Sequence, residues 1–220
     1  MSAASDAVTT AVTPSENLFT LLGSFVFGLY AAVLRLFEGS PTLPAGSTVT
    51  VRQSSLTIDV AGGLTVPAYW YFPADASPDR LILLQHGFLA SAPMYSYTAA
   101  QLAQNTHSIV VTLSLSSNFL DVYGAWTGGD PMHRAIAELF EGDRTALTAS
   151  ATAAAGRAVT LPTRFVLAGH SAGGGLALGV ANHLDAESLG NLAGILMFDG
   201  VAMGTVTAAD LIASLPADLP

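Results

Sequence analysis

Apolar runs alternate with helix-like apolar periodicities along most of the chain, and this alternation predicts the fold class. Four short, mostly apolar runs of the kind that forms buried strands lie at residues 81–84, 109–113, 165–168 and 195–198. Apolar residues at helical spacing predict helices at residues 93–105, 130–142, 143–155, 172–184 and 208–215. Strands that alternate with helices favour a mostly parallel sheet with helices on both faces, so the sequence predicts an α/β fold.

The pattern upstream of residue 81 is different. Residues 48–51, 56–60 and 64–72 alternate like three strands, and Gly62 and Gly63 mark a turn. The pattern divides the chain into a disordered tail at 1–12, an apolar helix at 13–40, a Pro/Gly/Ser-rich linker at 41–47 and one α/β domain at 48–220.

The predicted N-terminal helix contains a long uncharged stretch. Thr13, Pro14 and Glu16 form a helix-start signal, and residues 18–34 then carry no charge. This run of seventeen residues covers about 25 Å as a helix, and residues 18–37 reach about 30 Å, the thickness of a bilayer core. A signal peptide, a membrane anchor, and a helix packed on the domain or lying at a lipid interface all remain open, and with them membrane association or export.

Composition narrows the function classes. The chain has 220 residues, of which 51% are hydrophobic and 10% charged; it has no lysine, and its net charge is −9. Such an acidic chain argues against nucleic acid as a partner. Cysteine is absent, and the five histidines show no metal-ligand spacing, so we expect no metal and no cofactor.

One turn carries the strongest chemical signal. The predicted strand at 165–168 runs into Gly169-His170-Ser171-Ala172-Gly173, and the predicted helix follows at once. A G-x-S-x-G turn between a strand and a helix places a serine hydroxyl at the tip of a sharp turn, beside the positive end of the helix. The glycines at both flanks avoid collisions of β-carbons with the neighbouring strand or helix. Ser171 is therefore the candidate nucleophile.

A second motif follows the strand at 81–84, where His86-Gly87-Phe88 forms a His-Gly-X turn 84 residues before the serine motif. Together the two motifs resemble the α/β-hydrolase superfamily, specifically its serine esterases and lipases. The resemblance implies that the backbone N–H groups of Phe88 and Ala172 bind an oxyanion. It also implies that His86 and His170 are structural residues, and that residues 48–72 form the antiparallel strands that open the sheet.

The resemblance leaves the catalytic base unassigned. The superfamily orders its triad as serine, acid and histidine, but no histidine follows His183. His183 lies twelve residues past Ser171, about 18 Å along a helix. We therefore expect the chain to be a fragment, truncated at its C-terminus, with an incomplete fold and with the histidine in the absent part. A pseudo-enzyme, or a base from another chain, is the competing interpretation.

Asp199 is the tentative acid of the triad. It ends the strand after the serine motif, a place where some lipases of the superfamily carry their acid, while a strand-end aspartate that caps a turn is the structural alternative. The expected function is hydrolysis of carboxylic esters through an acyl-enzyme. Apolar residues near the expected site indicate an apolar or lipid-like substrate: Phe88, Leu89, Met94, Tyr95 and Trp126. The rival hypothesis is an inactive binding or interaction protein on the same scaffold.

Overall fold

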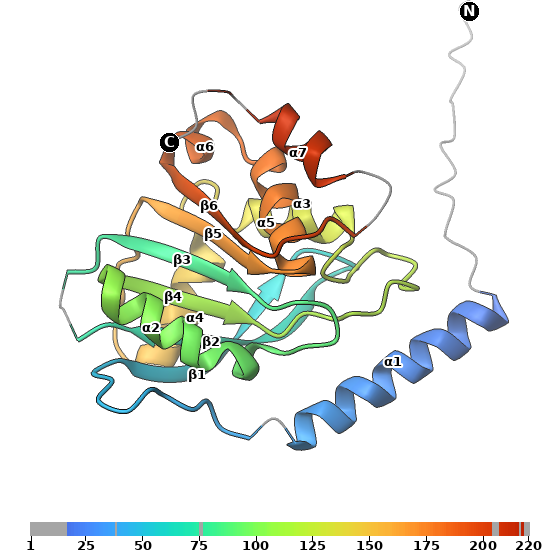
Figure 1. Cartoon of the computed structure of the whole chain (residues 1–220), viewed down its shortest axis with the longest axis horizontal. Coiled ribbons are helices and arrows are strands. Elements are labelled where there is room, and N and C mark those ends of the chain that lie inside the picture. The colour runs from blue at the N-terminus through green and yellow to red at the C-terminus, as the bar shows by residue number, and fades with distance from the viewer. Residues whose placement is uncertain (1–16, 38, 75–76, 204–206, 216, 218–220) are drawn as a thin grey trace, which may run out of the picture.

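A mixed sheet forms the centre of the protein. The computed structural model describes residues 17–37, 39–74, 77–203, 207–215 and 217 (Figure 1). The described residues form six strands: β1 (Thr50–Ile58), β2 (Leu64–Phe72), β3 (Arg80–Gln85), β4 (Ser108–Leu113), β5 (Phe165–His170) and β6 (Leu192–Phe198). Their order in the sheet is β1-β2-β4-β3-β5-β6. β1 and β2 are antiparallel to their neighbours, and β4, β3, β5 and β6 are parallel, which confirms the predicted mostly parallel sheet.

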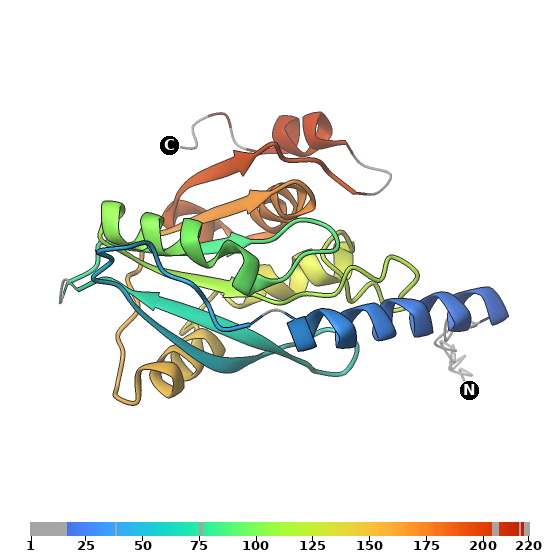
Figure 2. The same ribbon diagram turned by 60° about the horizontal axis from the view of Figure 1, so that its bottom comes forward.

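Helices cover both faces of this sheet, as Figures 1 and 2 show. α2 (Ser96–Thr106), which follows the 3₁₀ turn η1 (Ala92–Tyr95), packs on β4 and β2 from one side. On the other side α4 (Thr145–Ala155) packs on β1 and β2, and α5 (Ala172–His183) packs on β5 and β6, with α3 (Asp130–Glu138) against α5. Because β3 and β4 are covered on both faces, nearly all of their side chains are buried, which explains their apolar sequences.

Some boundaries differ from the prediction. The predicted strands at 48–51 and 56–60 are one continuous strand, β1, because all nine residues pair with β2 despite the polar run between them. α6 (Ala186–Asn191) was not predicted, and α7 (Ala208–Ser214) matches its prediction within one residue. The predicted tail at 1–12 and the helix start at Thr13 lie outside the described residues.

The N-terminal helix is α1 (Leu18–Phe37), and Asn17 caps it, since the Asn17 Oδ1 atom accepts a hydrogen bond from Thr20 N–H (3.0 Å). The helix is not uniformly apolar, which corrects that part of the prediction: Ser24 and Tyr30 make polar contacts with the domain. Within the described ranges, no helix combines the length and the apolarity that crossing a membrane requires. Figure 2 shows α1 beside the end of the sheet to which the parallel strands point.

Candidate active site

Ser171 stands in the tight turn between β5 and α5, and its backbone is strained. Its φ of 53° and ψ of −121° lie in a region that residues with a β-carbon rarely adopt. Backbone hydrogen bonds hold this conformation: Ser171 N–H donates to Phe198 O (3.1 Å), and Ser171 O accepts from Gly174 N–H and Val201 N–H (both 2.9 Å). The half-buried side chain therefore lies at the carboxyl edge of the sheet, where α5 begins.

Two glycines make this turn sterically possible. A β-carbon at Gly169 would collide with the backbone of Gly173. A β-carbon at Gly173 would lie 2.6 Å from His86 O and closer still to Gln85 O. The first glycine thus lets the strand meet the helix, and the second lets α5 approach the end of β3.

The His86-Gly87-Phe88 turn lies directly beside the serine. β3 pairs in parallel with β5, with Gln85 opposite Gly169, so both turns leave the sheet at the same level. A β-carbon at Gly87 would lie 3.2 Å from Ser171 Cβ, which shows how closely the two turns approach each other. We call residues 86–89 the oxyanion loop, after the role that the family resemblance implies for it.

Two backbone amides near Ser171 have no acceptor among the described residues. The hydrogen bonds of the described residues use Leu89 N–H and Ala90 N–H but neither Phe88 N–H nor Ala172 N–H. Ala172 is the first residue of α5, so its N–H belongs to the positive end of the helix. Free donors of this kind can stabilise negative charge that develops near the serine hydroxyl.

His86 fastens the oxyanion loop to the end of β4. Its ring is buried, with Nδ1 2.8 Å from Gly87 O and Nε2 3.1 Å from the Leu115 nitrogen. These partners assign a neutral ring that donates from Nδ1–H to Gly87 O and accepts from Leu115 N–H at Nε2. Burial lowers the pKa of His86 from 6.5 to about 4, although the hydrogen bond to Gly87 O acts to raise it. With both ring nitrogens engaged, His86 has a structural position.

Tyr95 connects the oxyanion loop to the serine turn. Its hydroxyl accepts a hydrogen bond from Gly87 N–H (3.2 Å) and lies 2.7 Å from His170 Nδ1. Sequence reasoning placed Tyr95 only among the apolar residues of the site, because nothing in the local pattern reveals this contact across 75 residues. His170 therefore directs its Nδ1 atom toward Tyr95.

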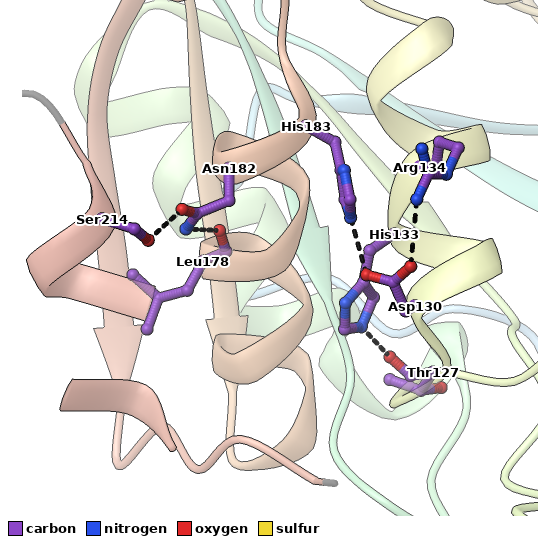
Figure 3. Close-up of polar contacts among 8 residues, drawn as sticks. All are labelled: Thr127, Asp130, His133, Arg134, Leu178, Asn182, His183 and Ser214. Atoms are coloured by element: carbon purple, nitrogen blue, oxygen red, sulfur yellow. Dashed lines mark hydrogen bonds and ion pairs between the residues drawn. The ribbon is translucent and has the colours of Figure 1, made fainter. Parts of the chain in front are cut away.

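The remaining histidines have partners elsewhere. Figure 3 shows His183 against Asp130, with His183 Nε2 2.7 Å from Asp130 Oδ1, and His133 against Thr127, with His133 Nε2 3.0 Å from Thr127 O. His107 ends α2 next to the first residue of β4, at the opposite end of the strands from Ser171. Among the described residues, no histidine forms a hydrogen bond with the Ser171 hydroxyl.

Asp199 follows β6 with a φ of 50° and an exposed side chain. Its neighbours in sequence, Phe198 and Val201, bond to the backbone of Ser171, so this segment borders the serine turn. In the part of the chain that the structure describes, no hydrogen bond or ion pair engages the Asp199 carboxylate. No cluster of three or more His, Asp or Glu side chains suited to a metal ion occurs there either.

Aromatic side chains surround the outer side of the oxyanion loop. The rings of Phe88 and Phe119 lie 6.4 Å apart, and Phe119 contacts Trp126 at 6.3 Å, as ring-centroid distances. Phe27 of α1 meets both Phe88 (6.3 Å) and Phe119 (5.4 Å) edge to face. We call these four residues the aromatic cluster; its α1 member was not predicted as part of the site.

The sheet order, the helices on both faces and the serine turn at the carboxyl edge define the α/β-hydrolase fold. No protein-family model matches the sequence, and no curated protein matches it. Solved structures do match. The thermostable carboxylesterase EstE1, cloned from a metagenomic library, is 20% identical with a TM-score of 0.50, over 91% of this chain and 63% of its own.

A bacterial heroin esterase is 18% identical with a TM-score of 0.50, over 81% of this chain and 52% of its own. The esterase LipW from Mycobacterium marinum is 18% identical with a TM-score of 0.49, over 86% and 54% of the two chains. At this level of identity the likeness to EstE1 and to the heroin esterase shows the fold alone, and the chain spans about half to two thirds of the length of the three esterases.

Proposed function

We propose that this chain carries the nucleophile and the oxyanion-binding amides of a serine hydrolase for carboxylic esters with an apolar part. The observation that supports the proposal is the proximity of Ser171, in its strained turn, to the free amides of Phe88 and Ala172. The esterases that share the fold agree with this reaction type.

In the proposed reaction, Ser171 Oγ attacks the ester carbonyl carbon while a base takes the hydroxyl proton. The carbonyl electrons move to the oxygen, and the two amides bind the resulting oxyanion. The intermediate collapses and expels the alcohol, which takes the proton from the base, and water then hydrolyses the acyl-enzyme by the same steps. Loss of one oxyanion donor costs about 2.7–4 kcal/mol in comparable sites, so the backbone positions of the loop are expected to contribute strongly to the rate.

We further propose that none of the five histidines of the sequence acts as the base, given the contacts described above. His86 is buried and doubly bonded, and His170 directs Nδ1 to Tyr95. His133 and His183 bond to other partners. We propose Asp199 as the acid of the site. Its carboxylate is unpaired among the described residues, borders the serine turn, and would orient a catalytic histidine that is not one of these five. We therefore expect p-nitrophenyl butyrate to give little sustained turnover, and brisk turnover would refute this assignment of the base.

A boronic acid tests the serine and the amides directly, because boron accepts the Oγ electron pair, the hydroxyl proton is released to the solvent, and boron becomes a tetrahedral anion in place of the oxyanion. We expect pentylboronic acid to bind the full chain and to show a tetrahedral ¹¹B NMR signal that Ser171→Ala abolishes. Ser55→Ala, at an exposed position of β1, is the matched control and should bind as the wild type does. A folded wild-type protein that gives no tetrahedral signal would favour the rival hypothesis of an inactive binding protein.

A further inference from the structure

α1 lies against the two loops that border the candidate active site. Tyr30 donates its hydroxyl proton to Leu89 O, and the Asn118 side-chain amide donates to Ser24 Oγ (3.0 Å). Gly23 lets the helix approach the same loop, because a β-carbon there would collide with the Leu120 side chain. The inner face of α1 is therefore fitted to the loops at the carboxyl edge of the sheet.

Two contacts of α1 fall on the oxyanion loop itself. Phe27 meets the Phe88 ring edge to face at 67°, in the arrangement that aromatic pairs prefer. Tyr30 bonds to the next residue, Leu89, whose φ of 57° is unfavourable for a residue with a β-carbon. On its other side Leu89 is held by its N–H, which donates to Ser117 Oγ (2.8 Å). Contacts from α1 and from the loop after β4 thus hold a conformation that the backbone alone does not favour.

The chain that continues from the oxyanion loop, at Ala90 and Ser91, borders a cavity. A cavity of about 180 Å³ lies between α1 and the sheet, and its lining includes Phe27, Tyr30, Ala90 and Ser91. A cavity of this size leaves a backbone segment room to shift, because the close contacts that would resist the shift are missing. On this side, the contacts of Phe27 with Phe88 and of Tyr30 with Leu89 are therefore the ones that restrain the loop.

We infer that α1 is a working part of the candidate active site, in which Tyr30 and Phe27 are positioning residues that keep Phe88 N–H directed at the oxyanion. This inference rests on the proposed function. It assigns to an N-terminal helix outside the α/β domain a role in stabilising the tetrahedral intermediate. If this inference is correct, loss of the contacts that Tyr30 and Phe27 make with the loop weakens binding of a tetrahedral adduct. Binding of a planar ligand then stays almost unchanged.

The test compares two ligands on the full chain: pentylboronic acid, which forms the tetrahedral adduct, and hexanamide, which cannot. Tyr30→Phe removes one hydroxyl, and Phe27→Ala removes the edge-to-face contact. We expect each variant to weaken boronic acid binding about 3- to 10-fold, the effect of one lost hydrogen bond or aromatic contact, with hexanamide affinity unchanged. Tyr97→Phe on α2 and Phe25→Ala on the exposed face of α1 are the matched controls and should change neither affinity.

Three outcomes would overturn the inference: unchanged boronic acid affinity in both variants, equal loss for the two ligands, or equal loss in Phe25→Ala. Hydrogen exchange of the peptide at 86–90 provides a second measurement that needs no ligand. Tyr30→Phe should speed this exchange relative to Tyr97→Phe, and equal exchange would also refute the role of α1. If the wild type binds no boronic acid, the proposed function fails, while the exchange result still decides whether α1 holds the loop.

Discussion

Acid should destabilise the protein through His86, in a pH range that its pKa defines. The folded protein holds the ring neutral with a pKa of about 4, while the unfolded chain protonates it near 6.5. Between these values the unfolded state binds the extra proton, so stability is fully present above about pH 6.5 and falls as the pH drops toward 4. At about 1.4 kcal/mol for each pKa unit, the loss reaches about 3 kcal/mol.

Urea unfolding from about pH 7 to about pH 4 measures this loss, and His86→Gln is the comparison, because glutamine does not titrate. Other groups titrate as well: burial lowers the pKa of His133, which contributes in the same direction. For Asp130, burial acts to raise the pKa, but His183 and Arg134 lower it below 3.8, so its contribution falls at more acidic pH. The difference between wild type and variant isolates His86.

The same protonation should release the oxyanion loop, because a protonated Nε2 atom cannot accept the hydrogen bond from Leu115 N–H. We therefore expect boronic acid binding by the wild type to weaken together with its stability as the pH falls. An unfolding free energy that depends on pH equally in wild type and His86→Gln would refute the buried, neutral histidine.

Two further predictions concern the serine turn and the outer face of α1. Gly173→Ala should lower the unfolding free energy by about 3 kcal/mol, because its β-carbon meets backbone oxygens that cannot move aside. In the control Gly190→Ala the new β-carbon has no atom within 4 Å, so the unfolding free energy should change by less than about 1 kcal/mol. Thermal unfolding measures both variants, and equal effects would contradict the close contacts at Gly173. We also expect α1 to bind phosphatidylcholine vesicles through exposed apolar residues such as Phe25 (68% exposed), so Phe25→Glu should reduce co-sedimentation, and wild-type protein that stays in the supernatant would remove the lipid-interface hypothesis.

Local sequence signals predicted the parts of the fold that local interactions determine. The apolar runs at β3, β4 and β5 and the glycines around Ser171 were sufficient for the parallel strands and the serine turn. β1 was predicted in two pieces because Ser54 and Ser55 interrupt its alternation. Pairing with β2, together with a hydrogen bond between the hydroxyls of Ser54 and Ser150 of α4, outweighs that local pattern.

The contacts that the sequence did not reveal are those between distant segments. α6 did have a local signal, since Asp185 caps it through Ser188 N–H, but six residues are too few for an apolar period to show. Tyr30 and Leu89 are separated by 59 residues, and Tyr95 and His170 by 75. Neither pair lies within one element, so no periodicity or spacing rule connects them. The residues that hold the site together therefore become visible only after folding.

The proximity of the two motifs follows from strand register and from glycine. β3 and β5 are neighbours, and Gln85 opposite Gly169 makes their turns begin at the same level. Equal level alone does not bring the turns together, because β-carbons at Gly87 and Gly173 would press on the opposing turn. The reacting groups proposed for this site are one hydroxyl and two backbone amides, so its sequence signature consists of glycines more than of polar side chains. A chain with the same serine and histidines but without these glycines would not assemble the site.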